Sequence, residues 1–149
     1  MLFLFDTNIL LLYVRESILI QHIKNIFNPF GKRNRSIVSV VNVGEIRAIS
    51  LKNNWGKQKN SKLEDLLSRL VIADINDEEI ISRYAEIDAF SQGRLEGKTS
   101  NFTARNMGKN DIWIAATASV LDATLLTTDN DFDHLQDEFL QVAKIDISI

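Results

Sequence analysis

Residues 2–8 read Leu-Phe-Leu-Phe-Asp-Thr-Asn, an apolar run of strand length that stops at an aspartate. A short apolar run bounded by polar residues is typical of a buried β-strand. Asp6, Thr7 and Asn8 carry the side-chain oxygens that begin helices, and the apolar positions 9, 10, 13 and 14 have helical spacing. The sequence therefore predicts a strand that leads directly into a helix, with Asp6 at the junction.

The same alternation continues along the chain. Further strands are predicted at 37–41, 71–75, 123–126 and 142–147, and helices at 18–30, around 45–49, and at 63–70, 77–90 and 112–121. Residues 93–108, rich in polar residues, are predicted to form a surface loop or a frayed helix end. Alternating strands and helices favour right-handed crossovers and a mainly parallel sheet with helices on both faces. We therefore expect an α/β fold, a single three-layer domain over residues 1–149.

Four acidic residues stand where the predicted strands and helices meet: Asp6, Glu45, Asp111 and Asp129. In parallel folds, ligands bind beyond the carboxyl ends of strands near a switch in strand order. Asp6 and Asp129 each follow a strand, so folding could bring all four acids to one edge. Two carboxylates about 4 Å apart repel by about 4 kcal/mol at an effective dielectric near 20. The predicted cluster needs a cation, and either Asp129 or Asp131, two residues further on, could face it.

Composition narrows the kind of cation and of protein. The chain has no cysteine, and His22 and His134 lie outside the acidic motifs, so an oxygen-only ligand set suits Mg²⁺ or Mn²⁺. No apolar run approaches the roughly 18 residues of a membrane span, and the apolar start reaches Asp6 too soon for a signal peptide. We expect a soluble cytoplasmic domain without a membrane partner. The net charge of −3 argues against binding polyanions through bulk charge but allows a local basic surface.

The motifs together resemble a known family. They read Phe-Asp-Thr-Asn-Ile-Leu from Phe5, Glu45 after the second strand, Asn-Asp-Ile-Trp-Ile-Ala-Ala-Thr-Ala from Asn110, and Leu-Leu-Thr-Thr-Asp-Asn-Asp-Phe from Leu125. In this order they resemble the PIN domain and, more narrowly, the VapC-type toxins of bacterial type II toxin–antitoxin systems. The resemblance implies a metal-binding set of Asp6, Glu45, Asp111 and Asp129, supported by Thr7, Asn8 and Thr128.

The resemblance also implies an activity and partners. It implies an Mg²⁺-dependent endoribonuclease, with transfer RNA among the candidate targets, a cognate antitoxin and a homodimer. Hydrolysis of a phosphodiester needs an activated water and stabilisation of growing negative charge, and carboxylate-held metal ions provide both. Apolar positions on the first helices, such as Leu11, Leu12 and Ile20, predict dimerisation there. Basic residues that could contact RNA phosphates are Arg94, Lys98, Arg105 and Lys109.

Other interpretations of the same residues stay open. Helix capping alone can explain Asp6 or Asp111, and Asp131 is explained as a turn residue. A phosphatase with a phospho-aspartate would want an aspartate two residues after Asp6, where Asn8 stands. The remaining alternatives are a DNA-directed nuclease with the same metal chemistry and a non-catalytic domain that serves in RNA binding or assembly.

Overall fold

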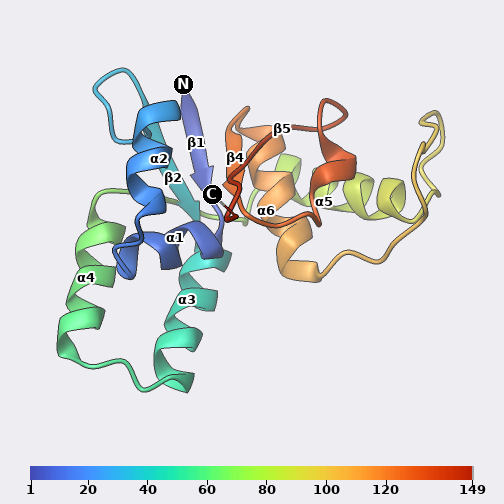
Figure 1. The fold of residues 1–149 in the computed structure, drawn as a ribbon. Helices are drawn as coiled ribbons and strands as arrows, with labels where there is room; N and C mark the ends of the chain where they lie inside the picture. Colours follow the sequence, from blue (N-terminus) through green and yellow to red (C-terminus); the bar gives the residue numbers. More distant parts are fainter. Residues whose placement is uncertain (149) are drawn as a thin grey trace.

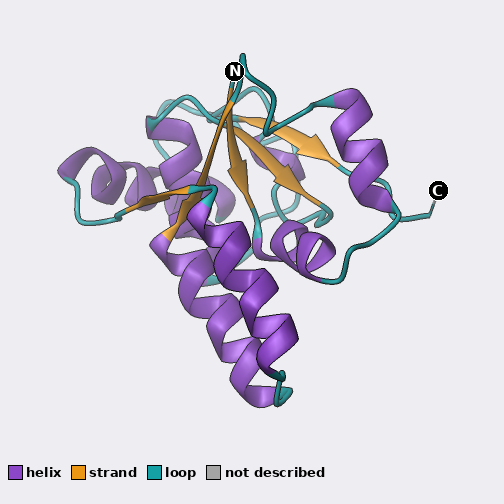
Figure 2. Cartoon of the chain, turned by 90° about the vertical axis from the view of Figure 1, so that its left-hand side faces the viewer, coloured by secondary structure: helices purple, strands orange, loops and turns teal. Residues whose placement is uncertain are grey.

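A five-stranded parallel sheet forms the centre of the structure, a computed structural model that describes residues 1–148 (Figures 1 and 2). The strands are β1 (Leu2–Phe5), β2 (Arg35–Ser39), β3 (Val71–Ala73), β4 (Thr124–Thr127) and β5 (Gln141–Lys144). Their order is β3-β2-β1-β4-β5, and every neighbouring pair is parallel. The chain builds the sheet outward from β1 in one direction and then returns to the other side. The switch in strand order therefore lies between β1 and β4.

Helices cover both faces of this sheet and complete the three layers that the sequence predicted. They are α1 (Thr7–Val14), α2 (Leu19–Ile26), α3 (Val40–Lys52), α4 (Lys57–Ser68), α5 (Glu78–Ser91) and α6 (Lys109–Val120), with a 3₁₀ turn η1 at Asp133–Leu135. Successive side chains of a strand point to opposite faces. Phe3 and Phe5 accordingly pack in the core formed with α1–α4, whereas Leu4 packs in the core formed with α5 and α6.

The strand and helix boundaries differ from prediction where polar side chains bind the backbone. The strand predicted over 37–41 ends at Ser39, because Ser39 and Asn42 form a capping box that begins α3. Ser39 Oγ accepts a hydrogen bond from Val41 N at 3.1 Å, and Asn42 Oδ1 accepts one from Ser39 N at 3.2 Å. The strand predicted over 123–126 is shifted by one residue, which places Thr127 inside β4.

Two long helices form a hairpin that projects from the body of the domain. Figures 1 and 2 show α3 and α4 side by side, joined at the far end by a short turn. Asn54 in this turn has φ +53°, a left-handed conformation that asparagine tolerates better than most residues. The helix predicted over 63–70 begins six residues earlier, because α4 starts at Lys57. As predicted, residues 93–108 lie between α5 and α6 without a regular element.

The first helices bury more of their apolar surface than the sequence suggested. Ile9 and Ile23 are fully buried, and Leu11 and Leu12 pack against the same core. The apolar residues that α1, α2 and their connection leave in solvent are instead Ile18 and Ile26, which are 86% and 56% exposed. Leu11 and Leu12 are therefore partly buried against this core. Among residues 1–148, no helix has both the length and the apolar character needed to cross a bilayer.

Candidate metal centre at the carboxyl edge of the sheet

Asp6 lies at the switch in strand order, directly after β1. It is 5% exposed, and its carboxylate begins α1 by accepting a hydrogen bond from Thr7 N to Oδ1 at 2.8 Å. Its Oδ2 accepts hydrogen bonds from Thr127 Oγ1 at 2.7 Å and from Asn8 Nδ2 at 3.3 Å. Burial raises the pKa of Asp6, and Glu45 and Asp129 raise it further against the hydrogen bonds that lower it. Asp6 is both a helix cap and a buried member of an acidic cluster.

Thr127, which the sequence analysis did not select, holds Asp6 in place. It is fully buried at the end of β4, and its hydroxyl donates to Asp6 Oδ2 and accepts from Asp129 N at 3.0 Å. The supporting role had been assigned to Thr128, but Thr128 contributes its backbone N–H, which donates to Asn8 Oδ1 at 3.1 Å. The register that pairs Phe5 with Leu126 places Thr127 beside Asp6. The hydroxyl that binds Asp6 is therefore that of Thr127, next to the predicted Thr128.

Substitution of Thr127 by Val should destabilise the protein by about 1–3 kcal/mol, because it removes the donor to a buried carboxylate and keeps the side-chain shape. Substitution of Thr128 by Val is the matched control and should change the free energy of unfolding by less than about 0.5 kcal/mol. Urea denaturation of both variants measures the difference. Equal effects of the two substitutions would show that the Thr127 hydroxyl does not support Asp6.

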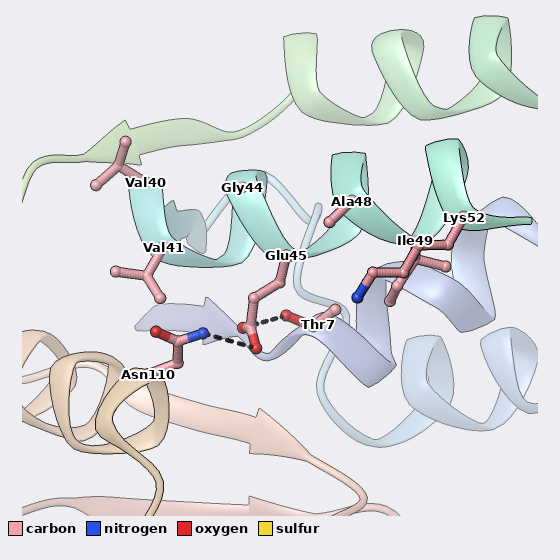
Figure 3. A pocket seen from close by; sticks show the side chains of 9 residues that line it. All are labelled: Thr7, Val40, Val41, Gly44, Glu45, Ala48, Ile49, Lys52 and Asn110. Atoms are coloured by element: carbon pink, nitrogen blue, oxygen red, sulfur yellow. Dashed lines mark hydrogen bonds between the residues drawn. The ribbon is translucent and has the colours of Figure 1, made fainter.

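Glu45 is held by hydrogen bonds from two other helices (Figure 3). Its Oε1 accepts from Thr7 Oγ1 at 2.9 Å, and its Oε2 accepts from Asn110 Nδ2 at 3.3 Å. Thr7 Oγ1 in turn accepts from Asn42 Nδ2 at 3.1 Å, and Asn42 is fully buried. These bonds join the first turns of α1 and α6 to α3 and fix the direction of the Glu45 carboxylate. A groove of 520 Å³ runs beside Glu45 along α3.

Asn110 lies just inside the start of α6 and does not cap it. The N-cap of α6 is Gly108, and the helix starts at Lys109. Asn110 and Asp111 therefore both lie in the first turn, where their side chains do not cap the helix. Asn110 donates to Glu45, and Asp111 belongs to the acidic cluster.

Three aspartates converge at the start of α6. Asp111, Asp129 and Asp131 each offer one carboxylate oxygen, and these oxygens all lie within 4.8 Å of one another. Asp131 N also donates to Asp129 Oδ1 at 3.0 Å, so the turn after β4 holds both residues at the site. Burial and, after it, the charges of Asp6, Asp129, Asp131 and Glu45 raise the pKa of Asp111 to about 7. The structure thus brings Asp129 and Asp131 together, where the sequence suggested one or the other.

The arrangement fits a hard divalent cation. None of the five acids forms a salt bridge within residues 1–148. Opposite oxygen ligands of one octahedral Mg²⁺ lie roughly 4.2 Å apart, close to the span of the three aspartate oxygens. Neither histidine belongs to this group of acids. Oxygen donors without nitrogen or sulfur favour Mg²⁺ or Mn²⁺ over Zn²⁺.

Without metal, the difference in stability between the Asp111→Asn variant and the parent protein should depend on pH. At pH values between 3.8, the pKa of Asp111 in the unfolded chain, and about 7, its pKa in the folded protein, Asp111 is protonated to a greater extent in the folded state. The stability that this protonation contributes is therefore complete below the unfolded pKa and is lost as pH rises through the folded pKa. His134 acts oppositely, because burial lowers its pKa to about 4, so the Asp111→Asn variant is needed to isolate Asp111. In EDTA, this variant should match the parent near pH 4 and exceed its stability by about 2 kcal/mol near pH 8, a figure reduced for partial exposure. A constant gap in urea titrations would contradict this.

The four predicted RNA-binding cations divide into two groups. Lys109 lines a hollow of 450 Å³ together with Glu45 and Asp111, and Arg105 lies near enough to Asp131 to oppose the rise in its pKa. Arg94 shares a separate hollow of 270 Å³ with Arg105. Lys98 forms a salt bridge with Glu138 at 3.2 Å and lies over the ring of Phe139. The structure therefore brings Lys109 and Arg105 to the acids and engages Lys98 elsewhere.

Comparison with known proteins agrees with this architecture. Residues 3–138 match the model of the family described as PIN domain, and no curated protein matches the sequence. A chain of VapBC2 from Rickettsia felis bound to a DNA fragment from its promoter is 23% identical, with a TM-score of 0.74 over 98% of this chain and 100% of that one. A chain of VapBC-1 from nontypeable Haemophilus influenzae is 23% identical, with a TM-score of 0.70 over 97% of this chain and 98% of that one. A chain of DNA-bound VapBC from Salmonella typhimurium is 18% identical, with a TM-score of 0.68 over 97% of this chain and 98% of that one. At these identities the similarity establishes a shared fold.

Proposed function

The chain belongs to the PIN domain family, and from that premise we propose that it is an Mg²⁺- or Mn²⁺-dependent endoribonuclease, the toxin of a VapBC-type pair. The observation that carries the proposal is the convergence of acids at the switch in strand order. Asp111, Asp129 and Asp131 share one site there, and Asp6 and Glu45 are near enough to raise the pKa of Asp111. A cluster that costs stability without a cation is explained if its role is to hold one.

Each acid has a role that follows from its surroundings. Asp111 and Asp129, with Asp131 beside them, would hold the ion, and Asp6 would face it from a position fixed by Thr127. When bound, a divalent ion activates water and stabilises charge on a phosphodiester. Glu45, whose two oxygens are oriented by Thr7 and Asn110, would accept a proton from an attacking water. Lys109 would contact a phosphate at the same edge.

The partners follow from the same proposal. Several structural relatives are VapBC complexes, which supports a cognate antitoxin for this chain as well. A toxin that cleaves RNA in the cell would act in the cytoplasm, and a homodimer is the assembly that the family resemblance implies. We propose the first helices as the dimer contact, because Leu11, Leu12 and Ile20 are only partly buried there and the neighbouring Ile18 and Ile26 are 86% and 56% exposed.

Purified protein should cleave RNA in the presence of Mg²⁺ and leave DNA of the same sequence intact. The matched control is the Asp6→Asn variant, which should cut neither and so excludes a contaminating ribonuclease. Cleavage of DNA at an equal rate would favour the DNA-directed alternative. Metal-dependent binding without cleavage of any RNA would favour a non-catalytic binding domain.

A further inference from the structure

The segment of the α3–α4 hairpin between Glu45 and Glu64 concentrates positive charge in a chain that is negative overall. Residues 46–62 contain five basic residues and no acidic one, whereas the whole chain has a net charge of −3. The basic residues are Arg47, Lys52, Lys57, Lys59 and Lys62. Lys57 and Lys59 occupy the first turn of α4, where the helix macrodipole disfavours positive charge. The macrodipole of α4 therefore does not explain the position of these two lysines.

Part of this charge surrounds a hollow between the end of α1 and the start of α4. The hollow has a volume of 490 Å³, and its lining includes Arg15, Lys59 and Lys62 but no carboxylate residue. Two of the three cations are held in place. Lys59 lies 4.6 Å from the centre of the Trp55 ring, and Lys62 contacts Glu16 at 3.3 Å. Cations that are already ordered lose less side-chain entropy when they bind an anion.

Helix α1 links this hollow to the acidic site. Asp6 begins the helix and Arg15 follows its last residue, so about 12 Å of helix axis separates them. This distance corresponds to three or four stacked nucleotides at about 3.4 Å each. Along α3, Figure 3 shows the Lys52 amine extending back through the groove toward Glu45 and Thr7. Cations therefore lie along two helices that begin at or near the acidic site.

We infer that the hollow of Arg15, Lys59 and Lys62 binds the phosphate backbone of an RNA whose scissile bond lies several nucleotides away at the acidic site. The inference rests on the proposed function. A strand with a charge on every nucleotide is repelled by the acids, so cations at a distance are needed to hold it there. The hollow is lined mainly by charged and polar residues, and its spacing from the site fits a polymer better than a small anion. RNA longer than the spacing should use the hollow, and a trinucleotide should not reach it.

The test compares two triple substitutions that remove the same charge. Arg15→Gln, Lys59→Gln and Lys62→Gln empty the hollow of cations, whereas Lys24→Gln, Lys32→Gln and Arg33→Gln remove exposed cations elsewhere. Binding of an RNA of roughly 20 nucleotides is measured across salt concentrations on an Asp111→Asn background, which leaves the RNA uncut. The hollow variant should bind about tenfold more weakly, and its salt slope should fall by about 2, near 0.7 for each lost contact. Its cleavage of a trinucleotide, on the active background, should equal the parent's.

The control triple should keep the parent's affinity and slope, and both triples should keep the parent's melting temperature. If the hollow variant bound the long RNA as tightly as the parent, the inference would be overturned. If the parent still cleaved RNA, the nuclease proposal would stand. Binding that depends on the hollow, in a parent that cuts no RNA, would retain the inference and reject the nuclease. Preference of the hollow for polyglutamate over RNA would assign the surface to an acidic protein and overturn the inference.

Discussion

Substitution of Asp111 by Asn should lower the rate of RNA cleavage by at least about a hundredfold and leave the metal-free fold as stable as the parent or more so. The substitution keeps the size of the side chain but removes one charge from a group of three aspartates whose oxygens lie within 4.8 Å. Because the Asp111 side chain does not cap α6, no helix-capping bond is lost. Single-turnover cleavage and urea unfolding in EDTA measure the two effects.

Asp122→Asn is the matched control for this variant. Asp122 lies just beyond the opposite end of α6, is exposed, and has φ +54°, a conformation that asparagine also tolerates. It should change neither activity nor stability. A parental cleavage rate in the Asp111 variant would show that this residue does not hold the ion. A loss of stability above about 1 kcal/mol would show that its charge does not strain the fold.

Metal binding should raise the melting temperature and be required for cleavage. The folded chain gathers acids that the unfolded chain disperses, so a ligand of the folded state stabilises it by about 2.7 kcal/mol at a hundredfold excess over Kd. For a domain of this size, that corresponds to a shift of roughly 5–10 °C. Cleavage should vanish in EDTA and return with Mg²⁺ or Mn²⁺. Ca²⁺, with looser coordination, should bind but support little turnover.

The same experiment has an internal check in pH. The pKa of Asp111 is raised to about 7, so the ion must displace a proton from it at lower pH. The apparent Kd for Mg²⁺ should therefore rise as pH falls below about 7. The Asp111→Asn variant should lose both this pH dependence and most of the melting shift. Cleavage that persists in EDTA, and is absent from the Asp6→Asn preparation, would reject a metal-dependent mechanism.

The sequence predicted the layers and the main acids because both depend on local patterns. Apolar runs reveal strands even when the residue at each end is uncertain, as at β1, and an acid directly after such a run lies at the sheet edge. The role of Thr127 could not be predicted, because nothing in the sequence distinguishes it from the adjacent Thr128. Which of them faces Asp6 is decided by the register of β4 against β1, between residues 121 positions apart.

That Asp131 joins Asp129 at the site, and that Asn110 binds Glu45, could not be predicted for a different reason. Each has an ordinary local explanation, as a turn residue or a helix cap, and local explanations are usually sufficient for such residues. Their position at the site depends on how the turn after β4 folds back and on where α6 begins. Gly108 rather than Asn110 is the N-cap, and this difference of two residues turns Asn110 into a partner of Glu45.

The sequence separation between Asp6 and Thr127 has a consequence for folding during synthesis. The two residues are separated by 121 positions, and β1 cannot pair with β4 until the later strand has left the ribosome. At about 5–20 residues per second, the interval is roughly 6–24 s. During that interval the nascent chain holds Asp6 without Thr127 and without the acids of the last motif. The acidic site, and with it any activity that depends on it, is therefore completed only after nearly all of the domain has emerged.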